Sequence, residues 1–178
     1  MIRKLVLATT LFVAACTAPY SLPANDRAEI ETRIAGFERA FVEGRTDAII
    51  NIIPPRMITA IAAKGGVPEK TLRREMAQAT REATREVKVV SFDMALEQAK
   101  FLTTATGRPY GLIPTQTVVQ RPDGTQTLQS DNTTLTLEDG GIWYLIRIED
   151  SRQINLLREI YPDFDGVTFP KGTTKVIG

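Results

Sequence analysis

The side chains that could do chemistry here are carboxylates, lysines, tyrosines and one cysteine, because the 178 residues include no histidine. A serine or cysteine nucleophile with a histidine base is therefore excluded, as is a zinc site built from histidine and cysteine. Any catalysis would have to rest on carboxylates, lysines, tyrosines or a hard metal ion that carboxylates bind.

The one cysteine, Cys16, ends the first hydrophobic segment of the chain. Two basic residues near the start precede an apolar run, Leu5 to Ala15. This run is too short to cross a hydrocarbon core as a helix, which takes roughly 20 residues. A basic start, a short apolar run and small residues at its end are typical of a secretory signal. We therefore expect a signal peptide at residues 1–15, followed by the cysteine and a tether at residues 16–25.

The residues Val13-Ala14-Ala15-Cys16 resemble the lipobox of bacterial lipoproteins, an aliphatic and two small residues before the cysteine. In that family the thiol is lipidated, the preceding peptide bond is cut and the new amino terminus is acylated. The resemblance implies a membrane partner, because several acyl chains hold a domain stably on a bilayer. Thr17 replaces the aspartate that favours inner-membrane retention, which implies the outer membrane, facing the periplasm. The alternative is a plain signal peptide with an incidental cysteine.

The charge of the chain argues against one class of partner. It has 22 basic and 21 acidic residues, a formal net charge of +1. Loss of Arg3 and Lys4 with the signal would leave a near balance, which provides no strong field to recruit nucleic acid. The phosphate-binding patterns G-x-x-x-x-G-K-[ST] and G-x-G-x-x-G do not occur. We expect no nucleic acid partner, no cofactor and no metal site.

The first half of the chain has helical periodicity. Ile30, Ile34, Phe37 and Phe41 form one apolar stripe, which predicts an amphipathic helix. A capping-box-like pattern places its start at Asp26, and Gly44 is a plausible stop. Further helices are expected at residues 46–53, 56–63 and 69–86. In the last of these, arginines and glutamates alternate, which predicts a solvated face with ion pairs.

The pattern changes near Val87 to the alternation of half-buried strands. Strands are expected at residues 90–96, 99–106, 110–120, 125–138 and 142–149. Turn signals with Gly124 and with Gly140-Gly141 predict consecutive hairpins and thus an antiparallel meander. Pro114 crosses one strand and suggests an edge or a bulge. A short helix is expected at residues 151–160, which makes residues 26–165 a single domain and residues 166–178 a tail.

Helices followed by an antiparallel sheet predict an α+β fold. The helix IETRIAGFERAFVEG, the hairpin turns and the final strand GIWYLIRIED resemble the NTF2-like superfamily, which includes ketosteroid-isomerase-like domains. The resemblance implies helices packed on a curved antiparallel meander, with a cone-like cavity between them. The chain departs from that family in its extra terminal helix and in having no clear strand between the second and third helices.

The strand at residues 142–149 carries candidate ligand-binding residues. Both of its faces begin apolar, so we expect a central strand covered on both sides. Arg147 then needs a partner, because an unpaired buried charge is costly; the candidates by type are Asp93, Asp131 and Glu149. One interpretation places Trp143 and Arg147 in a ligand cavity with Tyr110 at its mouth. The alternative makes Trp143 a core residue and Arg147 part of a surface or structural ion pair.

Three functions remain open at this stage. The leading one is a non-catalytic, lipid-anchored envelope domain that binds a protein partner or a small apolar ligand. The second, which the resemblance to ketosteroid-isomerase-like domains implies, is an isomerase- or lyase-like enzyme in an apolar cavity. Asp93 is then the candidate acid/base residue, with Tyr110 or Tyr144 as the donor. The third is a structural subunit of an envelope assembly, with an interface at the strand containing Pro114 or at the helix 151–160.

Overall fold

The structure, a computed structural model, describes residues 18–178 of the chain. The predicted signal peptide and Cys16 lie outside the described residues. Within them, four helices come first, an antiparallel sheet that does not close follows, and a short helix lies near the end. The predicted α+β class, with helices on an antiparallel meander, is therefore confirmed.

Most elements lie close to their predicted ranges. The helices are α1 (Ala24–Val42), α2 (Thr46–Ile50), α3 (Pro55–Gly65), α4 (Glu69–Arg85) and α5 (Ser151–Ile160). The strands are β1 (Ala18–Pro19), β2 (Lys88–Met94), β3 (Lys100–Thr103), β4 (Pro109–Gln120), β5 (Thr127–Asp139), β6 (Ile142–Ile148) and β7 (Thr173–Val176). Two single-turn 3-10 helices are η1 (Leu96–Gln98) and η2 (Pro162–Phe164).

The long hairpin of β4 and β5 forms the centre of the sheet. On the side away from β5, β4 pairs with β3 over residues 109–112 and with β2 over residues 115–120. On the side away from β4, β5 pairs with β7 over residues 128–131 and with β6 over residues 133–139. Gly124 and the pair Gly140-Gly141 have positive φ in the two hairpin turns, as the turn signals predicted. β2 and β3 are both neighbours of β4 and do not form a hairpin with each other.

Pro114 lies in a central strand, so the expectation of an edge strand is wrong. It falls where β4 changes its partner: Leu112 pairs with Lys100 of β3, and Thr115 pairs with Met94 of β2. The Pro114 carbonyl faces this gap and accepts the Ala95 N–H at 2.9 Å. The N and C=O of one strand residue point the same way. The proline nitrogen therefore faces the gap, where no ladder bond is lost.

β6 lies at the edge of the sheet, so the expectation of a central strand is also wrong. The Leu145 N–H, which points away from β5, donates to the Ile52 carbonyl at 3.1 Å. The Trp143 N–H donates to the Glu29 carboxylate on α1 at 3.1 Å. The segment after α2 and a side chain of α1 thus cover the edge. This cover explains why residues 143–146 are all buried in an edge strand.

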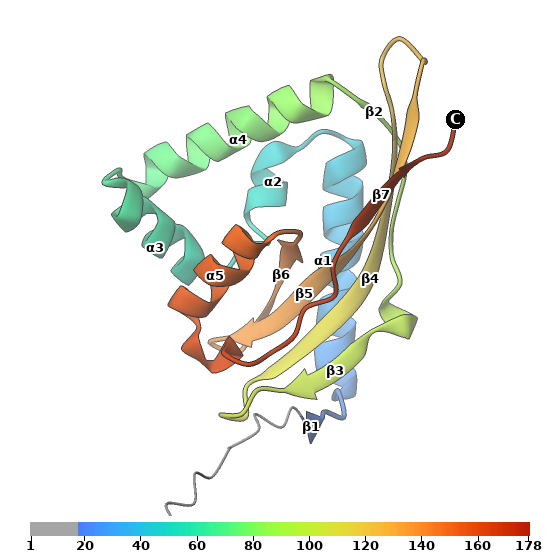
Figure 1. The fold of residues 1–178 in the computed structure, drawn as a ribbon. Coiled ribbons are helices and arrows are strands. Elements are labelled where there is room, and N and C mark those ends of the chain that lie inside the picture. Colours follow the sequence, from blue (N-terminus) through green and yellow to red (C-terminus); the bar gives the residue numbers. More distant parts are fainter. Residues whose placement is uncertain (1–17) are drawn as a thin grey trace, which may run out of the picture.

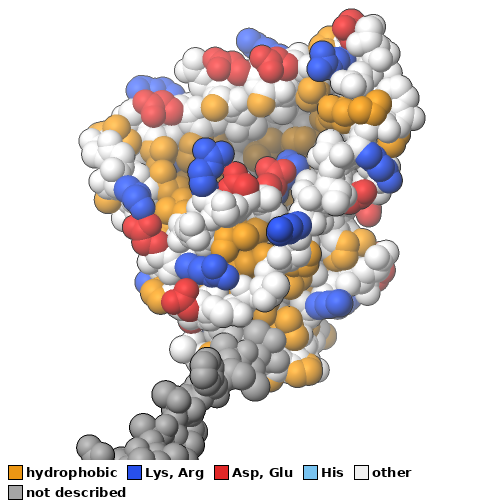
Figure 2. Space-filling model, in the orientation of Figure 1, with side chains coloured by type: hydrophobic (Ala, Val, Ile, Leu, Met, Phe, Trp, Pro, Cys, Tyr) orange, Lys and Arg blue, Asp and Glu red, His pale blue; other side chains and the backbone are white. Residues whose placement is uncertain are grey.

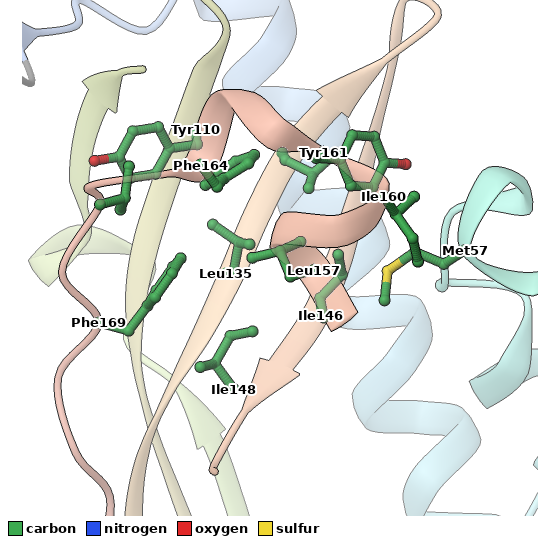
Figure 3. Packing of buried hydrophobic residues seen from close by; sticks show 12 residues of the cluster. Met57, Tyr110, Leu135, Ile146, Ile148, Leu157, Ile160, Tyr161, Phe164 and Phe169 are labelled. Carbon is green, nitrogen blue, oxygen red and sulfur yellow. The ribbon is translucent and has the colours of Figure 1, made fainter. Parts of the chain in front are cut away.

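Helices lie on both faces of the sheet. In Figure 1, α1 runs behind the sheet, α5 and the C-terminal segment lie in front of it, and α4 crosses the top from α3 to β2. Behind the sheet, Ile30 and Ile34 of α1 pack against Ile113, Trp143 and Leu145. The other face carries a second cluster, drawn in Figure 3, in which α5, η2 and the residues after η2 cover β4, β5 and β6.

Both ends of the described chain belong to the domain. Val167 and Phe169 are buried in the second cluster, and β7 pairs with β5, so residues 167–176 are not a tail. At the other end β1 pairs with β3, while Tyr20 and Leu22 pack against the α1 cluster. These contacts place much of the predicted tether in the fold. Residues 18–178 thus carry their own hydrophobic core.

The start of α1 differs from the capping-box prediction. The helix begins at Ala24 with Pro23 as its N-cap, and no side chain caps it. Asp26 lies in the first turn. Glu29 has a tertiary partner instead: one of its oxygens accepts the Arg33 Nε and the Trp143 N–H, each at 3.1 Å.

Candidate functional site

A cavity of about 400 Å³ lies between the helices and the sheet. Its size is within the range of small-molecule sites. The lining is mostly apolar and comprises Phe37, Phe41, Ile49, Ile52, Ile53, Met57, Ile61, Phe92, Met94, Leu145, Ile146 and Leu156, with Thr80, Thr115, Thr134, Arg147 and Gln153 as the polar members. Figure 2 shows this face of the molecule hollowed between α4 and α5, with hydrophobic side chains inside.

Three phenylalanines form one wall of the cavity. Phe37 and Phe41, one turn apart on α1, stack with ring centroids 5.7 Å apart. Phe92 of β2 tilts against both, at 5.2 Å and 5.1 Å. Residues at i and i+4 share a helix face, so the same apolar stripe that predicted α1 also supplies this wall.

Two threonine hydroxyls on the sheet side of the cavity satisfy each other. Thr115 of β4 and Thr134 of β5 are buried, and their Oγ1 atoms lie 2.7 Å apart. Thr115 also donates to the Ile113 carbonyl at 3.1 Å, so Thr134 is the donor between the two hydroxyls. Both hydroxyl protons are donated within the protein, so these two threonines have no hydrogen-bond donor left for a ligand.

Arg147 lies at the rim and is the one charged member of the lining within residues 18–178. Its side chain is 46% exposed, and its Nη2 pairs with the carboxylate of Glu149. Glu149 was one of the three partners expected by type. The Glu149 N–H donates to the side-chain carbonyl of Gln153 at 2.7 Å. Arg147, Glu149 and Gln153 therefore form one connected polar rim where β6 leads into α5.

The structure does not bring Tyr110 or Trp143 into this cavity. Tyr110 is buried on the α5 face, where its ring meets Phe164 edge-on at 5.3 Å (Figure 3). Trp143 is buried under α1, edge-on to Phe101 at 6.3 Å. Trp143 is thus a core residue, and the two rings lie on opposite faces of the sheet. Of the three candidate ligand-binding residues, Arg147 lines the cavity.

Asp93 and the tyrosines are far apart along the sheet. Asp93 is exposed and pairs with Gln116 across β2 and β4. Tyr110 lies six residues earlier on β4, a separation of about 20 Å at the usual strand rise. Tyr144 lies in the row of Tyr110, because both pair with Leu137. The acid/base arrangement predicted from the sequence is therefore not assembled; Asp93 lines a separate depression beside Gln116 and Asp131.

The carboxyl group with a raised pKa is Glu38, which sequence reasoning missed. Burial raises the pKa of Glu38, a hydrogen bond from the Met94 backbone opposes this, and the nearby charge of Asp93 adds to the rise. Glu38 follows Phe37 on α1 and is half-buried against β2. The one sequence signal was its position directly beside the apolar stripe of α1.

A second polar cluster joins the end of β5 to η2. The Tyr161 hydroxyl donates to Asp139 at 2.8 Å, and the guanidinium of Arg108 lies 5.2 Å from the Tyr161 ring centre. Arg108 also pairs with Asp163 and donates to the Glu138 carbonyl. Burial, and then the hydrogen bond to Asp139, raise the pKa of Tyr161. These contacts connect three segments of the chain, and we assign the cluster a structural role.

The charged face of α4 differs from its prediction. Within the described residues no ion pair joins the arginines and glutamates of this helix. Arg81 instead donates to the Thr46 hydroxyl at 3.0 Å, and Arg73 donates to Asn51 at 3.5 Å. The arginines thus connect α4 to α2 by hydrogen bonds and line a shallow groove between the two helices.

Comparison of the chain with protein-family models, with curated proteins and with solved structures found no match. Residues 18–178 contain no group of three or more carboxylates or other ligating side chains placed to hold a metal ion. Among the described helices, none has the length and the apolar character needed to cross a membrane. The site is therefore interpreted from its own geometry.

Proposed function

We propose that this chain is a lipid-anchored, non-catalytic domain of the bacterial envelope that binds a small apolar ligand. The observation that supports this is the apolar cavity of about 400 Å³, with Arg147 as its one charged lining residue in the described chain. Filling such a cavity removes apolar surface from water, which is the main favourable term in binding ligands of this kind.

The proposed anchor is Cys16, in the lipobox-like sequence Val13-Ala14-Ala15-Cys16. One residue separates it from β1, which lies at the end of the molecule opposite α4 (Figure 1). A lipid at Cys16 would hold the β1 end near the bilayer and turn the α4 end of the cavity away from it. A ligand would then enter from the periplasmic side.

The isomerase-like alternative needs a carboxylate and a tyrosine in the same cavity. The described lining contains neither, and Asp93 lies about 20 Å along the sheet from the row of Tyr110 and Tyr144 at the usual strand rise. The structural-subunit alternative placed an interface at the strand with Pro114, which is the central strand β4, or at the helix 151–160, which packs Leu157 and Ile160 into the core on one face of the sheet. The geometry therefore favours ligand binding.

Titration with the apolar fluorescent probe N-phenyl-1-naphthylamine tests the proposal. The chain from Thr17 onward contains every described element and is the protein to use. Thr80→Trp adds a large ring at a half-buried lining position of α4, while Ala79→Trp adds the same ring at the exposed neighbouring position. We expect saturable binding to one site, weakened at least tenfold in Thr80→Trp and kept in Ala79→Trp. Absence of saturable binding, or equal binding by both variants, would contradict the proposal.

A further inference from the structure

The polar groups of the cavity differ in whether they can still bind a ligand. Thr115 and Thr134 use their hydroxyl protons within the protein, so the sheet side has no free donor. Arg147 and Gln153 lie at the rim, connected through Glu149. A ligand with one polar group would therefore bury its apolar part against the phenylalanine wall and hold the polar group at this rim.

The rim has hydrogen-bond donors that the fold does not use. In the described chain Arg147 has one partner, the Glu149 carboxylate on its Nη2, which leaves the other guanidinium nitrogens free. The side-chain carbonyl of Gln153 accepts a backbone N–H, and its amide nitrogen donates to no described residue. A guanidinium and an amide N–H group that line the same cavity and both contact Glu149 suit an acid group, which accepts from both.

The ion pair of Arg147 and Glu149 does not prevent this use. Both side chains are partly exposed, at 46% and 40%. Exposed ion pairs contribute little stability. An acid group that reaches Arg147 from the cavity would meet it in a less hydrated place, where charge-assisted hydrogen bonds are stronger. Glu149 is not part of the lining, so Arg147 sets the charge preference at the mouth.

We infer that the ligand is an amphipathic anion, a medium-chain aliphatic carboxylate with its chain in the cavity and its acid group on Arg147. This inference rests on the proposed ligand-binding function. The volume of about 400 Å³ is near the lower end of the range for small-molecule sites. It suits one acyl chain better than a whole diacyl lipid.

Competition against bound N-phenyl-1-naphthylamine tests the inference with three ligands of equal chain length, decanoate, decanol and decylamine. We expect decanoate to displace the probe at about tenfold lower concentration than decanol, since a hydrogen bond to a charged group is worth that factor or more. Decylamine is expected to be the weakest competitor. In Arg147→Gln decanoate and decanol should displace the probe at similar concentrations, both measured on that variant.

Two further variants separate the effect of Arg147 from that of net charge. Arg152→Gln removes a positive charge from an almost fully exposed side chain on α5, and the preference for decanoate should remain. Glu149→Gln removes the competing carboxylate and should increase the preference. Equal displacement by all three ligands, or an unchanged preference in Arg147→Gln, would overturn the inference while leaving the cavity function intact. Failure of the probe itself to bind would instead contradict the proposed function.

Discussion

The hydroxyls of Thr115 and Thr134 hydrogen-bond across the two central strands, 2.7 Å apart. Two residues further along β5, the Thr136 hydroxyl is buried and has no hydrogen-bond partner in residues 18–178. The two β5 threonines lie on the same face of the sheet and are almost fully buried, at 3% and 0% exposure. They therefore form a matched pair that differs in whether the hydroxyl is bonded.

Replacement of each of these threonines by valine should have opposite consequences. Thr134→Val removes a bonded hydroxyl and should cost roughly 1–2 kcal/mol of unfolding free energy. Thr136→Val removes an unsatisfied buried hydroxyl and should leave stability unchanged or raise it by about 1 kcal/mol. Urea unfolding of the chain from Thr17 measures both. An equal loss in the two variants would show that Thr136 has a partner.

Glu38 predicts a pH dependence of stability. Its pKa is raised in the fold, mainly by burial, so the folded state favours the protonated carboxyl. The stability that such a group contributes is fully present below its own pKa in the unfolded chain. This stability is lost as the pH rises through the pKa of the group in the folded state. Glu38→Gln mimics the protonated form, so it should stabilise the protein at neutral pH and lose this advantage in acid.

The measurement is the unfolding free energy of both proteins across the acidic to neutral range. Glu97→Gln, at an exposed position on η1, serves as the control and should show no such trend. A constant difference between wild type and Glu38→Gln at every pH would contradict the assignment.

The lipid anchor is tested in cells with the full chain. Cys16→Ala should move the protein from the membrane fraction to the soluble fraction of a bacterial envelope, because no acyl chain can then be attached. Thr17→Asp should keep the protein on membranes and shift it towards the inner membrane, as the lipoprotein resemblance implies. Unchanged membrane retention in Cys16→Ala would contradict the anchor.

Local patterns in the sequence were sufficient for the order of the helices and the main strands from α1 to α5. The stripe of α1 and the glycines of the two hairpin turns are short-range signals, and each corresponds to an element in the structure. The role of Pro114 depended on where β2 and β3 divide the edge of β4, which is a long-range pairing. Burial of Val167 and Phe169 likewise depends on the distant strands they cover.

The candidate site, too, could be predicted only as far as short-range signals in the sequence allowed. Arg147 could be selected because a charged residue stood out in an apolar strand. Tyr110 could not be placed, because its face depends on the register of three strands. Tyr110, Leu137 and Tyr144 share one row, and Trp143, as the neighbour of Tyr144, points to the opposite face. Knowledge of that register would have shown that Tyr110 and Trp143 could not line the same cavity.

The proposed function requires that the cavity under α4 binds an apolar ligand. Titration of N-phenyl-1-naphthylamine into wild type, Thr80→Trp and Ala79→Trp tests it most directly. We expect saturable fluorescence enhancement in wild type and Ala79→Trp, with at least a tenfold loss of affinity in Thr80→Trp. The same affinity in all three proteins, or no saturable signal from the wild type, would contradict it.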